Sequence, residues 1–178
     1  KTSEKLDTIG VFGKSVEAVA LLAKVLIKKD LYDPATIYFA ADGILKASQK
    51  VPHFEPKFIF YKTDKWKNIH KDSKNAFEFF IKKFKKNIEV FDVPAYFKDI
   101  PRNHQIIHET DLANNFQAYY KKDKKKLSKE MRDAIERGLK YTAYDYANAI
   151  DFMEQSYQSY KEVFEDYHGV ITPSASGV

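Results

Sequence analysis

Apolar residues recur at the three- and four-residue spacing of an amphipathic helix in several stretches of this chain. The first stretch follows Ser15, a residue type suited to capping a helix, and Glu17 in its first turn favours the positive helix end. We predict that this helix ends near Asp30, and that a shorter helix occupies residues 40–48. The apolar positions of the first helix are Val16, Val19, Ala20, Ala23, Leu26 and Ile27.

A strand–helix–strand pattern occupies the middle of the chain. The short apolar and aromatic runs at 57–61 and 88–91 predict two strands. Between them we predict a helix that Asp72 or Ser73 would cap. Its apolar stripe consists of Phe77, Phe80, Ile81 and Phe84. Two strands joined by a helix are typical of a parallel βαβ unit with a right-handed crossover, so we predict such a unit near 57–92.

The rest of the chain is predicted to be mainly helical. Residues 102–120 form one candidate helix and residues 128–139 a second. A third begins at Thr142, where Thr142 and Asp145 resemble a capping box with Asp in the place of Glu. This last helix is long and is predicted to reach Tyr167.

The last helix carries an aromatic stripe that we assign to core packing rather than to stacking on nucleic-acid bases. The stripe consists of Tyr146, Ala149, Ile150, Met153, Tyr157, Tyr160 and Phe164. Residues 170–172 then predict a buried strand. The fold class is therefore α/β, with more helix than strand.

The charge balance indicates a lysine-rich surface. The formal charge is +5, from 30 Lys and Arg against 25 Asp and Glu, and 27 of the 30 cations are lysine. Proteins that read nucleic acid favour arginine, whose planar group pairs with phosphate and with guanine edges. The lysine bias therefore argues against nucleic acid as a partner. Aromatic residues make up 15% of the chain, which argues strongly against a disordered segment.

The chain contains no cysteine, which excludes a disulfide framework, a thiolate zinc site and a cysteine nucleophile. The longest apolar run, at residues 18–23, is far too short to cross a bilayer, and no signal peptide is visible. We therefore expect no membrane span and a cytoplasmic location.

Two local motifs suggest chemistry, and each has a plainer interpretation. His104 and His108 lie on one predicted helical face, but a zinc protease needs Glu directly after the first histidine, whereas Glu109 follows the second. We therefore predict no metal site. The cationic run at residues 121–126 could contact phosphate, and we interpret it as a solvated linker between two helices.

No hydrolytic nucleophile is evident. A serine nucleophile needs a tight, usually Gly-rich turn beside a base, and neither Gly-x-Ser-x-Gly nor a phosphate-binding loop occurs. Ser15 and Ser128 look like helix caps, and Ser174 and Ser176 lie in a terminal tail without a partner base. Reasoned from its residues alone, the chain has no self-contained active site.

Four segments in order along the chain resemble the amidase signature family of amide hydrolases, and together they extend from Leu6 to Gly177. The first segment consists of Leu-Asp-Thr-Ile-Gly at 6–10 and Ser-Val-Glu at 15–17, and the second is the strand–helix–strand at 57–94. The third consists of Met-Arg at 131–132, Ile-Glu-Arg-Gly at 135–138, and Tyr144 and Tyr146 before Ala149. The fourth is Val-Ile-Thr-Pro at 170–173.

The resemblance implies a mixed sheet flanked by helices, with residues 1–178 forming a single unit in the C-terminal part of a larger amidase-type domain. In this family two serines and a lysine form the catalytic triad, and all three precede the segments matched here. We assign no catalytic residue in this chain, and we expect no cofactor or metal. Two loops are candidates for lining the substrate pocket. The alternative interpretation of both loops as ordinary turns at strand ends carries equal weight. Their candidate residues are Asp7, Thr8, Ile9, Thr172, Pro173 and Ser174.

The resemblance thus implies a fragment of an amide hydrolase, inactive alone, whose full-length protein acts on a small-molecule amide. The alternatives are a non-catalytic, lysine-rich binding module of the same fold and a fragment of a transamidase-type subunit. A truncated amidase should also expose apolar surface where its missing part packed, so we expect association through that surface.

Overall fold

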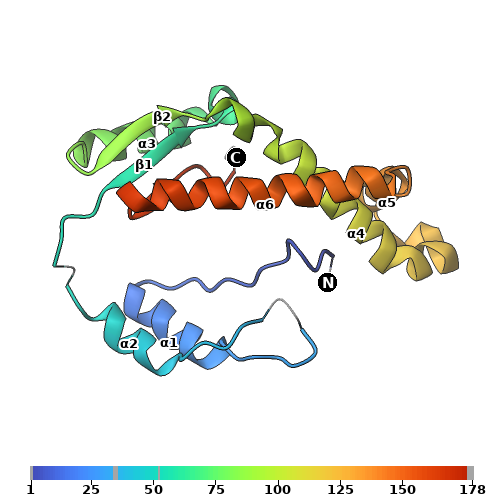
Figure 1. Ribbon diagram of the computed structural model, residues 1–178, viewed down its shortest axis with the longest axis horizontal. Helices are drawn as coiled ribbons and strands as arrows, with labels where there is room; N and C mark the ends of the chain where they lie inside the picture. The colour runs from blue at the N-terminus through green and yellow to red at the C-terminus, as the bar shows by residue number, and fades with distance from the viewer. Residues whose placement is uncertain (1, 34–35, 52, 176–178) are drawn as a thin grey trace. The chain divides into compact units, whose positions relative to one another are not determined.

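The computed structural model describes residues 2–33, 36–51 and 53–175, so Ser176 and Gly177 lie outside the described residues. Figure 1 shows the order of the elements along the chain. The helices are α1 Val16–Leu26, α2 Asp42–Ser48, α3 Lys71–Lys83, α4 Ile100–Asp123, α5 Lys129–Gly138 and α6 Ala143–Asp166, and the strands are β1 Phe58–Lys62, β2 Ile88–Asp92 and β3 Gly169–Ile171. Three short 3₁₀ helices, which the sequence did not predict, are η1 Asp64–Asn68, η2 Ala95–Asp99 and η3 Lys124–Lys126.

The chain divides into two compact units. The first comprises residues 1–53 and 108–139, and the second comprises residues 54–107 and 140–178. Helix α4 therefore contributes residues to both. Each unit is described below by itself.

The second unit contains a small parallel sheet with the strand order β2-β1-β3. Strand β1 pairs with β2 in parallel, from Phe58 opposite Ile88 to Lys62 opposite Asp92. This pairing confirms the predicted βαβ unit. Strand β3 also pairs in parallel with β1, and its three residues are half-buried rather than buried as predicted, because β3 forms an edge of the sheet.

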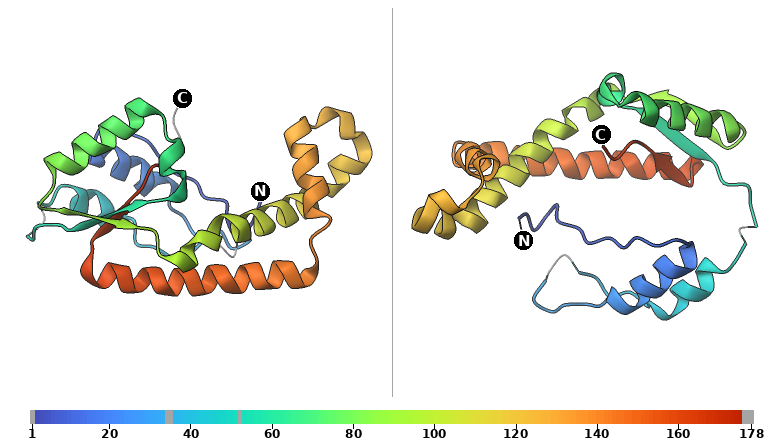
Figure 2. Two further views of the ribbon diagram at one scale, coloured as in Figure 1. Left: turned by 90° about the horizontal axis from the view of Figure 1, so that it is seen from above. Right: turned by 180° about the vertical axis from the view of Figure 1, so that it is seen from behind.

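Neighbouring residues of β1 point to opposite faces of the sheet, as in any strand. Phe60 is fully buried, and its ring lies 5.6 Å from Phe77 of α3 and 5.4 Å from Trp66 of η1. Tyr61 faces the other side, where Tyr160 of α6 is close enough to influence it electrostatically. Figure 2 shows α3 and α6 on opposite sides of the sheet.

The two helices beside the sheet begin with side-chain caps. Helix α3 is capped by His70, whose Nδ1 accepts from the backbone N–H of Asp72, so the prediction of Asp72 or Ser73 as the cap was wrong. Asp72 instead lies in the first turn, where its negative charge interacts favourably with the positive end of the helix dipole. Helix α6 begins with the predicted capping box, in which Thr142 and Asp145 each accept the other's backbone N–H.

The aromatic stripe predicted on α6 is buried only in part. The fully buried residues of α6 are Ala149 and Ser156, and Tyr160 is half-buried. Tyr157 and Phe164 are exposed, contrary to the core assignment. The helix therefore buries one narrow face in the described structure.

The first unit contains a tightly packed helical hairpin formed by α4 and α5. Its core consists of Leu112, Ala113 and Ile135, against which Phe116, Tyr120, Leu127, Met131 and Ala134 pack. Helix α4 is longer than predicted and includes Lys121–Asp123, so the first half of the cationic run is helix rather than linker. Ser128 caps α5 as predicted, by accepting from the backbone N–H of Met131.

The same unit contains α1, which packs beside α2 (Figure 1). Ser15 caps α1 as predicted, but the helix ends at Leu26 and not near Asp30. The physical reason is that the residues after Leu26 form hydrogen bonds with one another in a loop. Lys29 Nζ donates to the carbonyls of Asp33 and Thr36, and the backbone N–H of Asp30 donates to Thr36 Oγ1. Such local bonds compete with helix continuation.

Among the described residues, no helix is both long and apolar enough to cross a membrane.

Candidate functional site

The three parallel strands all end at one edge of the sheet. Strand β1 ends at Lys62, β2 at Asp92 and β3 at Ile171. In open α/β sheets, ligands bind outside the carboxyl ends of parallel strands. We therefore treat this edge, together with the residues that follow each strand, as the candidate site.

An aromatic cluster lies behind this edge. Tyr96 and Phe97 of η2 follow β2, and their ring centroids lie 4.1 Å apart. Phe97 in turn stacks on Tyr160 of α6, with ring centroids 4.5 Å apart. Tyr61, next to the last residue of β1, is buried. Elements far apart in the sequence thus bring three phenols, Tyr61, Tyr96 and Tyr160, to one place.

Two phenols of this cluster, Tyr61 and Tyr160, are neutral donors and acceptors rather than bases. Burial raises the pKa of Tyr61 above its ordinary value, and the neighbouring Tyr96 adds to the shift. Burial also raises the pKa of Tyr160, with smaller contributions from Tyr61 and Tyr96. Tyr61 and Tyr160 therefore keep their protons at neutral pH and can each hydrogen-bond a polar ligand.

The predicted pocket residues at the C-terminal strand lie at this same edge. Thr172 and Ser174 directly follow β3 and are exposed, and Pro173 between them is half-buried. Two hydroxyl groups are thus accessible where the topology rule places a ligand. Their contact with a substrate stays a prediction.

The other predicted pocket residues lie in the first unit. The carboxylate of Asp7 accepts hydrogen bonds from the backbone N–H and the hydroxyl of Thr2, at 2.7 and 2.6 Å. Both bonds lower the pKa of Asp7, and the bond from the hydroxyl has the larger effect. Thr8 is exposed and Ile9 is almost fully exposed. The six predicted residues therefore fall in two units, and their joint lining of one pocket stays a prediction.

Segment 2–7 is held firmly to α4. Ser3 is fully buried and donates a hydrogen bond of 2.5 Å from Oγ to Asp111 Oδ2, while the same Oγ accepts from the backbone N–H of Leu6. Asn115 Nδ2 donates to the carbonyl of Thr2. Ser3 was not singled out in the sequence, and no local pattern marks it, because its partner lies 108 positions away.

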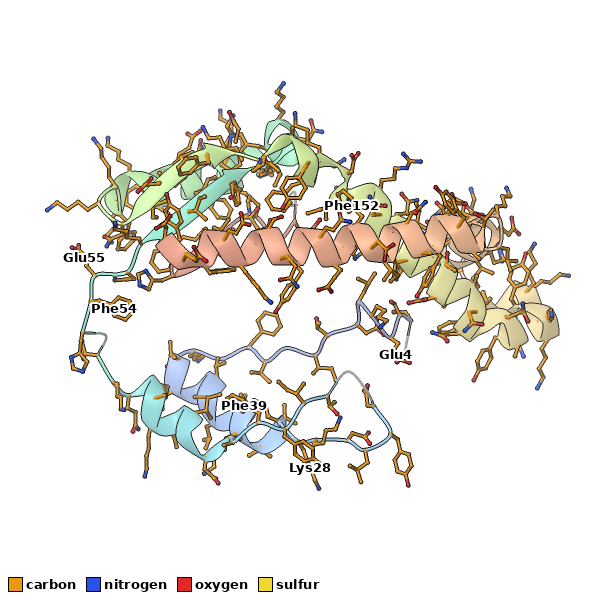
Figure 3. The ribbon with its side chains drawn as sticks, viewed as in Figure 1. Glu4, Lys28, Phe39, Phe54, Glu55 and Phe152 are labelled. Atoms are coloured by element: carbon orange, nitrogen blue, oxygen red, sulfur yellow. The ribbon has the colours of Figure 1, made fainter. Side chains whose placement is uncertain are left out.

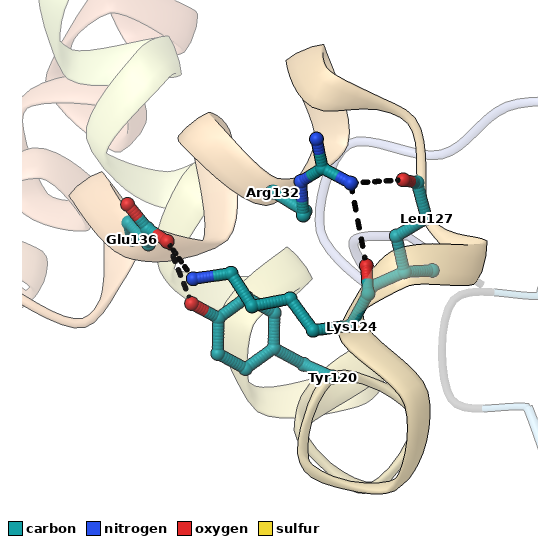
Figure 4. A network of polar contacts seen from close by, with 5 residues as sticks. All are labelled: Tyr120, Lys124, Leu127, Arg132 and Glu136. Carbon is teal, nitrogen blue, oxygen red and sulfur yellow. Dashed lines mark hydrogen bonds and ion pairs between the residues drawn. The ribbon is translucent and has the colours of Figure 1, made fainter.

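The cationic run is partly engaged in a structural network, which Figure 4 shows. Lys124 Nζ donates to Glu136 Oε1 at 2.5 Å, and Tyr120 Oη donates to the same oxygen at 2.7 Å. The bond to Glu136 is the largest of the contributions that raise the pKa of Lys124. Arg132 Nη1 donates to the carbonyl of Leu127 at 3.0 Å. Lys124 thus ties the end of α4 to α5 instead of extending as a solvated phosphate ligand.

The described residues contain no group of three or more His, Cys, Asp or Glu that could hold a metal ion. His104 and His108 both lie on α4.

Comparison with known proteins identifies a family and solved structures of similar fold. The model of the Amidase family matches residues 1–177. An inhibitor-bound complex, described as a vestigial protein complex that reveals the evolutionary origins of an s-triazine catabolic enzyme, is similar with a TM-score of 0.71 at 15% identity, over 87% of this chain and 33% of that chain. A crystal structure of an amidase is similar with a TM-score of 0.68 at 16% identity, over 96% of this chain and 36% of that chain. No curated protein matches the chain.

This chain spans about a third of the length of the solved structures that it matches. At these identities the similarity concerns the fold alone.

Proposed function

We propose that this chain, which belongs to the amidase family, forms the later part of a hydrolase that cleaves carboxamide C–N bonds. The observation that carries the proposal is the family match over residues 1–177, to which the similar fold of a solved amidase adds support. The chemistry is assigned to a part of the amidase that this chain does not supply.

In the whole enzyme, the reaction follows the scheme implied by the family resemblance. A serine oxygen attacks the amide carbon while a second serine relays its proton toward a neutral lysine. The C–N bond breaks and the nitrogen leaves as ammonia or an amine after it receives the proton. Water then hydrolyses the acyl-serine ester, which releases the carboxylic acid and restores the serine.

The chain's own contribution is to shape and orient the substrate pocket. Thr172 and Ser174 would offer hydroxyls at the carboxyl edge of the sheet, and the stacked rings of Tyr96, Phe97 and Tyr160 would support that edge from behind. The hydrogen bonds of Asp7 and Ser3 would hold segment 2–7 in place, and with it the loop that begins at Asp7.

The experiment that tests the proposal measures ammonia release from a panel of carboxamides. We expect none from residues 1–178 alone, and release when the amidase segment that carries the serine and the lysine is present, either fused or as a second chain. Release from residues 1–178 alone, after heat and purification controls, would contradict the assignment of the nucleophile. No release from the assembled protein on any amide would contradict the hydrolase proposal.

A matched pair of substitutions tests the role of the edge. Thr172→Val removes a hydroxyl at nearly constant volume, and we expect about a tenfold rise in KM with a smaller change in kcat. Thr63→Val makes the same change directly after β1. A larger effect at Thr63 than at Thr172 would place the substrate elsewhere along the edge.

A non-catalytic, lysine-rich binding module is the second candidate, and one surface favours it. An open groove beside α3 and β2 is lined by Lys62, Lys82 and Lys85, together with one carboxylate, Glu78, and with Trp66 and aliphatic residues. Salt-dependent retention on an anionic resin carrying phosphate groups would support this function, and its loss in Lys82→Gln would locate it. No retention at low salt would remove it.

A transamidase-type subunit would differ from a simple hydrolase by passing ammonia on to a second substrate. We also expect a cytoplasmic location, which fractionation of the native cells would test.

A further inference from the structure

The connection between α4 and α5 carries a dense group of positive charges. Residues 121–129, which we call the lysine tip, contain six lysines and one aspartate, a net charge of +5. The formal charge of the entire chain is also +5, so the rest of the chain is neutral in sum. In Figure 3, side chains that end in nitrogen project from this connection. The six lysines are all exposed, and they are Lys121, Lys122, Lys124, Lys125, Lys126 and Lys129.

The accessibility of the lysine tip follows from its own chemistry. An apolar surface could not cover six ammonium groups with one carboxylate among them, because unpaired charge would then be buried. The tip and the hairpin core that supports it lie within residues 108–139, which belong to one compact unit. The local structure of the tip is therefore that of a single unit.

Hydrogen bonds hold the lysine tip in a defined shape. Lys124 Nζ and Tyr120 Oη both donate to Glu136 Oε1, which ties the end of α4 to α5 (Figure 4). Arg132 Nη1 donates to the carbonyls of Leu127 at 3.0 Å and Lys124 at 3.5 Å, which closes the connection from the side of α5. Charges that are already ordered lose less conformational freedom when they bind a partner. The other lysines are thus presented by a preorganised connection.

Local stability accounts for some of these lysines and not for all of them. Lys121 and Lys122 lie in the last turn of α4, where the helix dipole favours a cation, and Lys126 Nζ lies 3.2 Å from Asp123 Oδ2. Lys129 is the opposite case, because it is the first residue of α5, where the helix dipole disfavours a cation. Crowded like charges also repel one another. A cation at a position that costs stability indicates a use outside the fold.

An exposed aromatic ring accompanies the charges. Tyr119 of α4 is 64% exposed, and it precedes Lys122 by three residues, so the two side chains lie on the same side of the helix. A phenol combines an apolar ring with a polar end, and a lysine combines an apolar stem with a charged head. Both side chains are therefore suited to the boundary between lipid headgroups and acyl chains.

We propose that the lysine tip binds the surface of a bilayer that contains anionic phospholipid. Groups of about four to eight cations at a protein surface are sufficient for such binding, since each adds to the attraction by the negative headgroups. Lysine acts as a point charge, and a fluid array of headgroups requires no fixed pairing geometry. No helix of the described residues is long and apolar enough to cross a membrane, so the contact is confined to the surface. This inference goes beyond the proposed function and does not rest on it.

Nucleic acid is the other extended polyanion, and the lysine tip lacks the side chains that read it best. All the cations of the tip are lysine, whereas proteins that recognise phosphate and base edges favour the planar group of arginine. Arg132 follows the tip in sequence, and its guanidinium donates to two carbonyls of the connection. The chemistry therefore favours lipid, and nucleic acid is an outcome of the test.

The test measures co-sedimentation of residues 1–178 with vesicles of phosphatidylcholine alone and of phosphatidylcholine mixed with phosphatidylglycerol. We expect binding to the mixed vesicles at low salt, no binding to the neutral vesicles, and release as the salt concentration rises. The combined variant Lys122→Gln, Lys125→Gln and Lys129→Gln removes three charges and leaves the Lys124 network intact. Its binding to the mixed vesicles should be at least about tenfold weaker.

A matched control removes three exposed lysines near the end of α3, by Lys83→Gln, Lys85→Gln and Lys86→Gln. The net charge falls equally, and binding should stay within about threefold of the wild type. Equal weakening by both variants would reduce the binding to an effect of net charge and would overturn the inference. Strong weakening by the control alone would transfer the binding surface to α3 and would also overturn it.

Melting temperatures separate binding from stability. Lys129→Gln removes a cation from the first turn of α5, so the melting temperature should rise slightly or stay unchanged. A clear fall would mean that Lys129 serves the fold, and would overturn the inference. Equal binding to neutral and mixed vesicles, or none to mixed vesicles at low salt, would overturn it directly. Displacement from the mixed vesicles by a polynucleotide at equal phosphate concentration would make nucleic acid the preferred partner, and would also overturn it.

Discussion

The α4–α5 hairpin and helix α1 belong to the same compact unit but are packed very differently. In the hairpin, Ile135 is fully buried and Gly138 lets the two helices approach closely. In α1, five large apolar residues remain exposed although the helix is by composition far more apolar than α5. The hydrophobicity of a helix therefore does not measure its burial. A narrow apolar stripe needs one partner, which the chain supplies for α5, whereas a helix that is apolar on most sides needs several.

The largest effect expected within this comparison comes from truncating the centre of the hairpin core. Ile135→Ala should lower the free energy of unfolding by about 3 kcal/mol, because it removes buried methylene groups and leaves a cavity. Val25→Ala on α1 should change it by less than about 0.5 kcal/mol, since the side chain is exposed. Urea titrations followed by circular dichroism measure both. A large loss with Val25→Ala would show that α1 is buried in the chain alone, and would break the comparison.

Two glycines on helices of the same unit give the next contrast. A Cβ at Gly138 would lie 2.0 Å from the backbone oxygen of Glu109 and 3.0 Å from Ala113 Cβ. Gly138→Ala should therefore force the helices apart and cost about 2 kcal/mol.

Gly43 of α2 has nothing within 4 Å of the same position. Gly43→Ala should raise stability by about 0.5 kcal/mol through its higher helix propensity. Thermal melts of the two variants measure the expected loss of stability in Gly138→Ala and the expected gain in Gly43→Ala. Unchanged stability in Gly138→Ala would mean that the hairpin is loosely packed.

A buried ion pair sharpens the contrast further. Arg137 donates from Nε and Nη2 to Glu109 Oε1, at 2.9 and 2.6 Å, and the Glu109 side chain is 5% exposed. Arg137→Met would leave that carboxylate without these two bonds, at a cost of about 1.5 kcal/mol, because water reaches the half-exposed arginine side of the pair. Lys129→Met, an exposed cation on the same helix, is the control and should cost less than about 0.5 kcal/mol. Equal losses in the two variants would indicate a general charge effect.

The smallest expected effect is a pH dependence at the start of α6, outside the hairpin. The Thr142 hydroxyl, and then its backbone N–H, donate to Asp145 and lower its pKa below the ordinary value of 3.8. A carboxyl with a lowered folded pKa stabilises the protein above its ordinary pKa, and this contribution is lost as the pH falls through the folded pKa. Asp145→Asn should therefore flatten the fall of the melting temperature below about pH 4 and change little at neutral pH. If the melting temperature of Asp145→Asn fell with pH as that of the wild type does, the capping box would be ruled out as the source of the fall.

The amidase resemblance and the α/β fold class are confirmed by the family match and the structural neighbours. Local signals predicted the elements well, because caps such as Ser15, Ser128 and Thr142 and the apolar spacing act over a few residues. The cap of α3 was missed because His70 is an uncommon cap that accepts through a ring nitrogen.

The candidate site was only partly predictable. Thr172, Pro173 and Ser174 were chosen from the sequence and lie at the carboxyl edge of the sheet. The aromatic cluster behind that edge was not, because Tyr61, Tyr96 and Tyr160 come from a strand, a 3₁₀ helix and a distant α-helix. Tyr61 lies one residue before the end of β1, and this position near the carboxyl end of a strand is the sequence signal that could have suggested the cluster.

The sequence by itself determined the helices, the parallel βαβ unit and the absence of cysteine chemistry, because periodicity, caps and residue types are local properties. Tertiary structure decided which apolar faces are buried. Ile135 finds its partners on α4 across a hairpin, and Ser3 finds Asp111 more than a hundred residues away. Five large apolar residues of α1 are exposed in the described structure, and no local pattern could have distinguished them from those of a buried helix. Burial depends on contacts between distant segments, and the spacing of apolar residues along one helix does not encode them.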